Sequence, residues 1–168
     1  MKKIYTKLLF LFVFVFSSSI SAATLYEDAL NRGINPTCAN YLNQIENSYN
    51  LNGLNLTFAN PSEPSLFPSL HVSSQKYNNG SAIFSATLTP DEEYCYLSTV
   101  LVTSVNNQTC SEIAQLKLGI EPELAVSSYA DGSYTIITPK DNSYQIILTA
   151  YSENGCTMAE TRMIWPGK

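Results

Sequence analysis

The sequence predicts an α+β protein in which short N-terminal helices pack on an antiparallel β-sheet. Helix start signals and helical spacing of apolar residues occupy residues 24–49. From Leu70 onward, short segments rich in β-branched and aromatic residues follow one another, separated by turn formers. No strand–helix–strand rhythm recurs, so a parallel sheet is not expected. Six or seven strands would also suit a β-sandwich or a partly closed barrel, which is the alternative fold.

Helix signals define three segments. Residues 24–27 (Thr-Leu-Tyr-Glu) have the spacing of a capping box and predict a short helix that Gly33 ends. Asn35 followed by proline predicts a second helix over about Pro36 to Ser48. Residues 109–112 (Thr-Cys-Ser-Glu) repeat the capping-box spacing and predict a third helix of about two turns.

The strands are predicted from alternating or continuous apolar runs between turn formers. Asn79-Gly80 separates the first two runs and is a strong hairpin signal. Both faces of the third run are substantially apolar, which places that run centrally in the sheet. No internal repeat of fixed period is visible. The expected strands are Leu70 to Tyr77, Ser81 to Thr89, Tyr94 to Val105, Leu124 to Tyr129, Ser133 to Thr138, Ser143 to Tyr151 and Cys156 to Trp165.

The first 23 residues have the pattern of an export signal. Three lysines among the first seven residues precede an apolar run over residues 8–16 and a small-residue stretch that ends at Ala23. The apolar run is shorter than the roughly 20 residues that span a bilayer. We therefore expect residues 1–23 to be a signal peptide and residues 24–168 to form one domain.

The charge balance excludes one class of partner and favours another. The chain has 9 Lys+Arg and 14 Asp+Glu, a formal net charge of −5. All the acidic residues follow residue 23, whereas three lysines leave with the signal, so the mature chain has 9 − 3 = 6 basic residues and a net charge of 6 − 14 = −8. Nucleic-acid binding is not expected, because phosphate recognition needs clustered basic residues. A cationic partner is favoured at long range.

The four cysteines are expected to form two disulfides. An even number of cysteines in an exported chain is typical of proteins that fold in an oxidising compartment. Three connectivities are possible. We favour Cys95 with Cys110, which closes a short loop, and Cys38 with Cys156, which ties together the two ends of the chain.

The sequence predicts no catalytic residue, no cofactor and no metal site. His71 is the only histidine and falls inside a predicted strand, so a structural or merely exposed role is expected for it. The cysteines are taken up as disulfides, and no C-x-x-C supplies a zinc site. Motifs for phosphate, dinucleotide or metalloprotease chemistry are missing, and so is the serine-hydrolase elbow.

Two acidic connections and four tyrosines are the candidate partner-binding residues. Carboxylates can attract a basic cleft, and tyrosine is enriched at protein interfaces. The tyrosines sit on consecutive predicted strands and could share a face. The plainer alternatives are solvated loop tips for the carboxylates and half-exposed strand positions for the tyrosines. The candidates are Asp91, Glu92, Glu93, Glu121, Glu123, Tyr129, Tyr134, Tyr144 and Tyr151.

The layout of the chain resembles small periplasmic proteins of the immunity and inhibitor type from Gram-negative bacteria. The resemblance lies in a signal segment, short helices, a strand with a cysteine (Tyr94-Cys95-Tyr96), a cysteine opening a helix (Cys110) and a late cysteine before the final strand (Cys156). The Ser-Gly-x-x-Tyr loop of periplasmic lysozyme inhibitors is not matched, since its nearest counterpart reads Ala-Asp-Gly-Ser-Tyr over 130–134.

The signal segment, the missing catalytic groups and the net charge of −8 predict a non-enzymatic periplasmic protein, or alternatively a secreted one, that binds a partner with a basic surface. We expect it to be a monomer or a homodimer. The resemblance implies that the partner is a toxic cell-wall or membrane hydrolase, which the protein occludes. Two alternatives stand beside it. One is a surface or pilus-assembly subunit or adhesin built on the β-rich half. The other is a small hydrolase that works through two carboxylates.

Overall fold

The computed structural model describes residues 23–164, which form three α-helices, one 3-10 turn and eight strands. The predicted signal segment, except Ala23, and the expected strand end at Trp165 lie outside the described residues. Within 23–164 no helix combines the length and apolar character needed to cross a membrane. The elements are α1 (Leu25–Asn31), α2 (Pro36–Tyr49), β1 (Leu54–Phe58), β2 (Ser69–Tyr77), β3 (Gly80–Asp91), β4 (Tyr94–Asn106), α3 (Cys110–Ile120), β5 (Ala125–Tyr129), η1 (Ala130–Gly132), β6 (Tyr134–Thr138), β7 (Tyr144–Ser152) and β8 (Gly155–Ile164).

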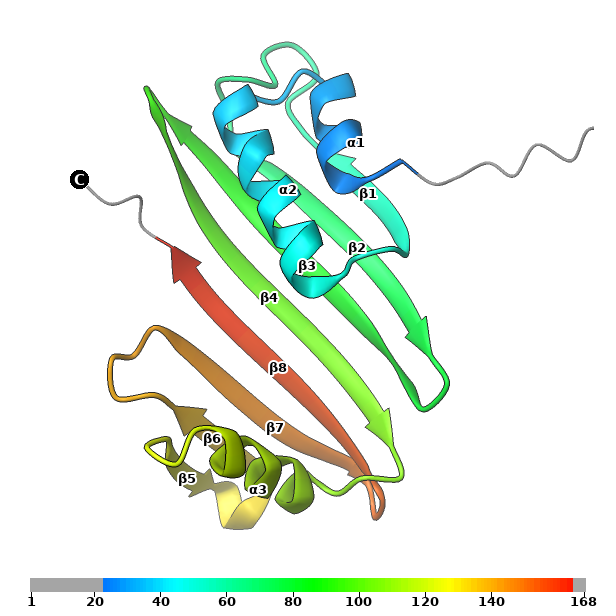
Figure 1. Ribbon diagram of the computed structural model, residues 1–168, viewed down its shortest axis with the longest axis vertical. Coiled ribbons are helices and arrows are strands. Elements are labelled where there is room, and N and C mark those ends of the chain that lie inside the picture. The colour runs from blue at the N-terminus through cyan, green and yellow to red at the C-terminus, as the bar shows by residue number, and fades with distance from the viewer. Residues whose placement is uncertain (1–22, 165–168) are drawn as a thin grey trace, which may run out of the picture.

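All eight strands join one antiparallel sheet in the order β1-β2-β3-β4-β8-β7-β6-β5 (Figure 1). The sheet is open, with β1 and β5 at its edges. The predicted combination of helices with an antiparallel sheet is confirmed. The sandwich and barrel alternatives are wrong, because the strands neither split into two sheets nor close on themselves.

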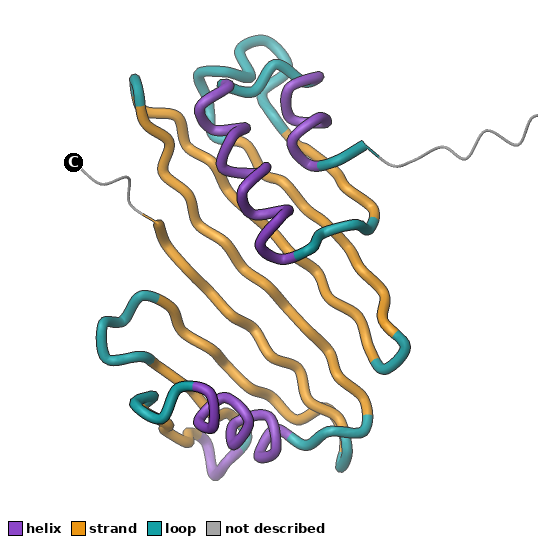
Figure 2. Tube along the Cα trace, in the orientation of Figure 1, coloured by secondary structure: helices purple, strands orange, loops and turns teal. Residues whose placement is uncertain are grey.

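The helices lie on one face of the sheet, α1 and α2 over the β1–β4 half and α3 over the β5–β8 half (Figures 1 and 2). Successive side chains of a strand point to opposite faces, so alternate residues meet the helices. Phe84 and Leu88 of β3 join the core beneath α2. Ile146 and Leu148 of β7 join a separate core beneath α3. No helix among the described elements covers the other face.

The architecture is an approximate internal duplication of one helix followed by four strands. The first copy is α2 with β1–β4 and the second is α3 with β5–β8. The last strands of the two copies, β4 and β8, pair at the centre of the sheet, where Val100 faces Thr161. Cys95 and Cys156 each stand five residues before this pair, so an approximate two-fold axis passes through it.

The disulfides follow the same duplication, and the predicted pairing is wrong. Each bond ties the first turn of a helix to the last strand of the same copy, Cys38 to Cys95 and Cys110 to Cys156. The expected Cys95–Cys110 bond fails because β4 separates these residues. Cys95 opens the 13-residue strand and Cys110 follows its far end, roughly 35 Å away at 3.3 Å per residue. A disulfide spans less than about 7 Å between Cα atoms.

The predicted helix starts are confirmed by their capping bonds. In both capping boxes the threonine side chain accepts from the backbone N–H three residues on, while the glutamate accepts from the threonine N–H (Thr24 with Glu27, Thr109 with Glu112). Asn35 caps α2, whose first residue is proline. The third helix is longer than expected, at 11 residues.

The strand predictions differ from the structure in two places. The hairpin between β2 and β3 forms, but its two turn residues are Asn78 and Asn79, and Gly80 opens β3 opposite Tyr77. A Cβ on Gly80 would stand 2.0 Å from the Ser104 carbonyl oxygen, so glycine permits the close approach of β4. Strand β1 has no counterpart among the predicted segments.

Candidate functional site

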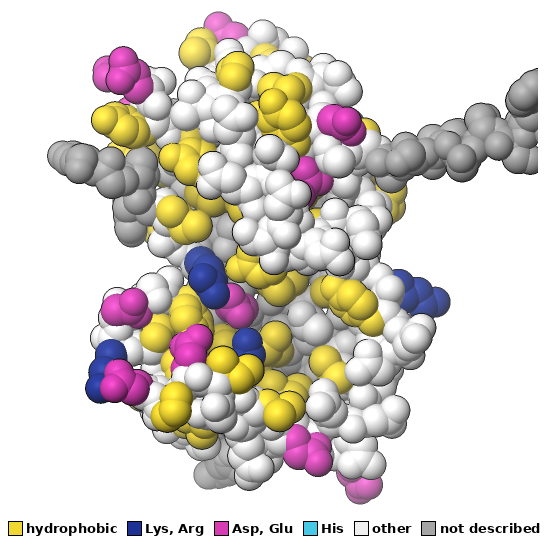
Figure 3. All heavy atoms as spheres, viewed as in Figure 1, with side chains coloured by type: hydrophobic (Ala, Val, Ile, Leu, Met, Phe, Trp, Pro, Cys, Tyr) yellow, Lys and Arg dark blue, Asp and Glu magenta, His cyan; other side chains and the backbone are white. Residues whose placement is uncertain are grey.

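The layer of helices is divided by a cleft whose floor is formed by β4 and β8, the strands at the centre of the sheet. Figure 3 shows the hollow between the two halves, with hydrophobic side chains beside basic and acidic ones. A cavity of about 440 Å³ occupies the α2 side of this cleft. It is lined by Tyr41, Gln44, Ile45, Ser48 and Tyr49 of α2 and by Leu97, Thr99, Arg162 and Ile164 of the two strands.

A charged cluster lies in the cleft around Glu160 of β8, whose side chain is 9% exposed. Its Oε1 lies 2.8 Å from both Nε and Nη2 of Arg162, and its Oε2 lies 3.8 Å from Nζ of Lys117 on α3. A largely buried carboxylate needs such partners, because an unpaired charge away from water is costly. The cluster thus links α3 to the central strands.

Arg162 continues the cluster to Tyr144 on β7. The guanidinium carbon lies 4.8 Å from the centroid of the Tyr144 ring, and the tyrosine hydroxyl donates a 2.6 Å hydrogen bond to Oε2 of Glu121. Burial, followed by the bond to Glu121, raises the pKa of Tyr144 to about 12. Burial also raises the pKa of Tyr49. Both phenols stay protonated at neutral pH, and that of Tyr144 donates the bond to Glu121.

A second pocket, of about 410 Å³, opens between the end of α3 and the β6–β7 turn. Its lining includes Glu121, Glu123 and Tyr144 together with Lys140 and Asp141. Lys140 pairs with Glu123 at 3.2 Å, and both side chains are exposed. Three carboxylates outnumber the single lysine, and α3 adds the negative end of its dipole. The pocket favours a cationic group.

Three of the nine predicted partner-binding residues, Glu121, Glu123 and Tyr144, therefore meet in this pocket. The acidic residues 91–93 lie elsewhere. Asp91 ends β3, and Glu92 and Glu93 form the turn to β4, at the top of the view in Figure 1, whereas α3 lies at its foot. The Asp91 carboxylate accepts a hydrogen bond from Tyr96, which raises the pKa of that tyrosine. The two acidic connections serve separate surfaces.

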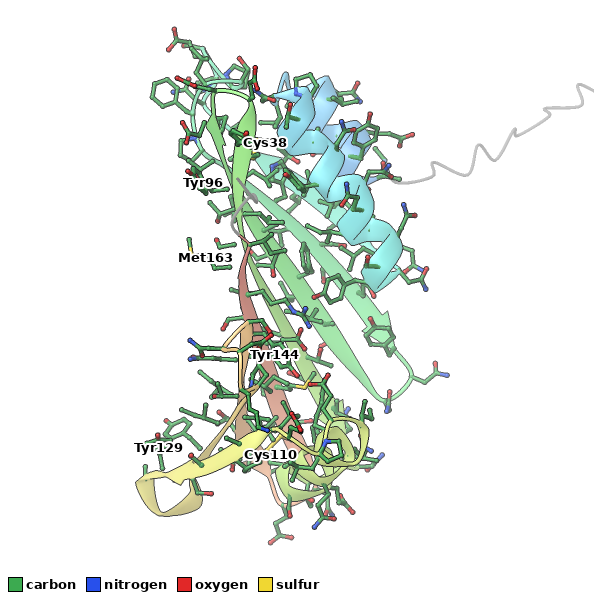
Figure 4. The ribbon with its side chains drawn as sticks, turned by 60° about the vertical axis from the view of Figure 1, so that its left-hand side comes forward. Cys38, Tyr96, Cys110, Tyr129, Tyr144 and Met163 are labelled. Atoms are coloured by element: carbon green, nitrogen blue, oxygen red, sulfur yellow. A yellow bond between two sulfur atoms is a disulfide. The ribbon has the colours of Figure 1, made fainter. Side chains whose placement is uncertain are left out.

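The prediction that the four tyrosines share a face is wrong for Tyr144. Tyr129 and Tyr134 stand directly opposite each other at the β5–β6 turn, and Figure 4 shows Tyr129 on the side away from α1 and α2. Tyr144 lies on the opposite face of β7 from Ile147 and packs against the core beneath α3, so it is on the helix side. Tyr151 sits at the β7–β8 irregularity, where its hydroxyl donates to the Val105 carbonyl and contacts Asn106.

His71 is enclosed between two hydroxyl side chains and is 0% exposed. Its Nδ1 lies 3.0 Å from Oγ1 of Thr57, and its Nε2 lies 2.8 Å from Oγ of Ser69. Burial lowers its pKa to about 4, so the ring is neutral at pH 7. Solvent does not reach this arrangement, so it holds β1 and β2 together and offers no nucleophile to a substrate.

Sequence reasoning missed the cluster of Glu160, Arg162 and Lys117. A signal for two of them was present, since Glu160 and Arg162 stand two residues apart in an otherwise uncharged predicted strand and must share a face. Among the residues that the structure describes, no group of three or more His, Cys, Asp or Glu side chains could hold a metal ion.

Comparison of the chain with protein-family models, curated proteins and solved structures found no match. The function is therefore inferred from the geometry and charge of these pockets.

Proposed function

We propose that this protein acts by binding another protein and catalyses no reaction. In this proposal it resembles the periplasmic immunity proteins and inhibitors that occlude a toxic cell-wall or membrane hydrolase. The observation that carries the proposal is the pocket at the end of α3, where Glu121, Glu123 and Tyr144 lie together. In this proposal the pocket receives a lysine or arginine side chain of a basic partner.

The charge of the pocket supports a cationic partner side chain. Glu123 is paired only with Lys140 at the surface, and such exposed pairs contribute little, so an incoming cation can replace the lysine at small cost. Glu121 already accepts the bond from Tyr144, which fixes one carboxylate before the partner arrives. A preorganised acceptor lowers the entropy cost of binding.

The periplasm is the proposed compartment. Both disulfides require an oxidising environment to persist, and the N-terminal segment has the pattern of a bacterial export signal. The net charge of −8 proposed for the mature chain would speed encounter with a basic partner at low ionic strength.

The test is affinity capture from a periplasmic extract of the source cells, with the protein immobilised through a C-terminal tag. We expect the wild type to retain a basic protein, and we expect Glu121→Gln/Glu123→Gln to retain at least about 10-fold less, since it removes both pocket carboxylates. Asp91→Asn/Glu92→Gln is the matched control, because it removes two charges at the other end of the molecule and should retain as much as the wild type.

Two results would count against the proposal. Retention of nothing between about 50 and 500 mM salt, a range over which surface attraction is progressively screened, would remove the binding role. Equal loss in both double variants would show that only the net charge attracts the partner. An assay of the retained protein before and after addition of the wild type then measures whether binding occludes a hydrolase.

A second candidate, a subunit of a surface assembly, is favoured by the two edge strands. β1 and β5 each have one neighbour in the sheet, and neither contains a charged residue or a proline. Natural edge strands usually carry such features to prevent strand addition. Gel filtration of the purified protein distinguishes the two candidates, since strand addition predicts large assemblies and occlusion predicts a monomer or dimer.

A further inference from the structure

The face of the sheet opposite the helices is a surface that no described helix covers. Figure 4 shows Tyr96, Met163 and Tyr129 projecting from this face, on the side away from α1 and α2. The register places the alternate residues of every strand with them. More than half of the exposed large hydrophobic side chains of the described chain lie here: Leu54, Leu56, Phe58, Leu70, Ile83, Tyr94, Val100, Tyr129, Tyr134, Ile147 and Met163.

Strand β1 and the first half of β2 turn their apolar residues toward this open face and their polar residues toward the helices. Buried under α1 and α2 are Thr57 of β1 and the alternate β2 residues Ser69, His71, Ser73 and Gln75. The open face carries leucine and phenylalanine from β1 and Leu70 and Val72 from β2, with Ser74 and Lys76 following toward the end of β2. A sheet in water normally shows the reverse arrangement. The pattern is the one expected if the open face is covered in the working protein.

A row of six apolar residues and two serines crosses this face through all eight strands. Direct cross-strand partners make up the row: Leu54, Ser74, Ile83, Val102, Ala159, Ile147, Ile136 and Ser127. Among the strand residues that share the face, only Lys76 and Asp91 are charged, and both stand at strand ends. The remaining positions are mainly serine and threonine.

The size of the face matches what a stable dimer requires. The eight strands average 8.5 residues, and at about 4.8 Å between strands and 3.3 Å per residue they form a face of roughly 950 Å². Stable interfaces bury about 800 Å² on each partner. A second sheet of the same extent could therefore cover most of this face.

We propose that the open face binds the open face of a second copy of this chain, forming a two-layer sheet packing. A basic partner attracted by carboxylates finds a single complementary charge on this surface, Asp91 at a strand end. Two acidic copies repel each other wherever like charges meet, so this nearly uncharged face is where they can pack closely. The arrangement leaves the pocket at Glu121 and Glu123 accessible on the helix side, and it does not depend on the function proposed for that pocket.

The test is sedimentation velocity of the protein purified from the periplasm of an expressing host, from about 5 to 200 µM. We expect the wild type to sediment with twice the monomer mass. Val100 lies at the centre of the face, on the strand pair β4–β8, and is 38% exposed. A face-to-face dimer buries the centre of the face first, and in a symmetric dimer the introduced carboxylate would lie close to its own counterpart, so Val100→Glu should weaken dimerisation by at least about 100-fold.

Two further variants make the result decisive. Ile83→Glu, at a position 51% exposed on the same face, should also dissociate the dimer and serves if Val100→Glu loses its folded circular dichroism spectrum. Leu116→Glu, at a position 58% exposed on α3, should leave the dimer intact. A monomeric wild type throughout the range would overturn the proposal. So would a dimer that persists in folded Val100→Glu and Ile83→Glu, because another surface would then hold it.

Discussion

His71 belongs to a residue type that often acts in catalysis, and the fold shifts its pKa far from its ordinary value. The ring is enclosed by Thr57 and Ser69, and burial holds its pKa near 4 against an ordinary value of 6.5. The nearby Asp28 carboxylate opposes this shift only in part. The unfolded chain therefore binds a proton at this residue over a pH range in which the folded chain does not.

Stability is expected to fall as the pH drops from about 6.5 to about 4. Well above pH 6.5 the ring is neutral in both states and contributes no pH dependence. Between the two pKa values protonation favours the unfolded chain, by about 2 kcal/mol at pH 5 and about 3 kcal/mol at pH 4. Urea unfolding at pH 7, 5 and 4 measures this loss.

The variant His71→Gln isolates the contribution of the histidine, because glutamine keeps hydrogen-bonding groups but does not titrate. The carboxylates contribute to acid sensitivity in both proteins, so the difference between the two stability profiles reports His71 alone. Parallel profiles from pH 7 to pH 4 would show that the buried ring titrates normally.

Glu121, Glu123 and Tyr144 could be selected as candidates from the sequence, but their position together in one pocket could not be predicted. Their meeting depends on the end of α3 lying beside the β6–β7 turn, which is a tertiary contact. The face of each tyrosine depends on strand register, and a shift by one residue reverses it. Tyr134 lies opposite Thr149, which places it on the other side of the sheet from Tyr144.

At the scale of elements, local signals predicted the helix starts, but the attachment of α1 to the fold was not predictable. The Glu46 carboxylate on α2, 8% exposed, accepts backbone hydrogen bonds from Leu25 and Tyr26 in the first turn of α1. Because Glu46 lies about 20 residues after the start of α1, no local sequence pattern predicts that it caps this helix. Asn55 adds a 2.9 Å bond from its side-chain amide to the Ala23 carbonyl.

Glu46→Gln is expected to destabilise the protein by about 1–2 kcal/mol, because a neutral amide accepts these backbone bonds more weakly than a buried carboxylate does. Amide hydrogen exchange in α1 should become faster. Glu27→Gln, which weakens only the exposed capping box, is the matched control and should cost less than about 1 kcal/mol. Equal losses in the two variants would mean that Glu46 is no more than a local cap.

Strand β1 shows why one element was missed. Its sequence Leu-Asn-Leu-Thr-Phe alternates as a strand should, but it is short and follows the predicted helix closely. Its burial is the reverse of the usual pattern, since Thr57 is 3% exposed whereas Phe58 is 57% exposed. A core list drawn from hydrophobicity alone would have placed its residues on the wrong face.

At the scale of the whole molecule, the duplication accounts for the disulfides. A preference for short loops favours a bond between the neighbouring cysteines Cys95 and Cys110. In the structure each helix instead packs on the last strand of its own copy, so the bonds join Cys38 to Cys95 and Cys110 to Cys156. The two copies have strands of different lengths, so the repeat has no fixed period and the sequence does not reveal it.

Removal of either disulfide is expected to cost a similar amount of stability. The bonds close loops of 57 and 46 residues, and chain entropy assigns about 4 kcal/mol to each. Cys38→Ala/Cys95→Ala and Cys110→Ala/Cys156→Ala should therefore lower the free energy of unfolding by comparable amounts. Peptide mapping without reduction checks the pairing itself, and a peptide joining Cys95 to Cys110 would contradict the structure.

The two halves are expected to differ in local stability, although they share one sheet. The first half buries a larger hydrophobic core, which includes Phe84 and Leu97, whereas the second is built on a smaller set around Ile137, Ile146 and Leu148.

Every residue of β5 is exposed and its only neighbour is β6, so opening this edge exposes little apolar surface to water. We therefore expect amide hydrogens of β6 that bond to β5 to exchange faster than those joining β3 to β4. The variant Cys110→Ala/Cys156→Ala should widen this difference, because it releases α3 from β8 while leaving the first half bonded. Equal protection in both hairpins would show that the continuous β4–β8 ladder makes the two copies unfold as one unit.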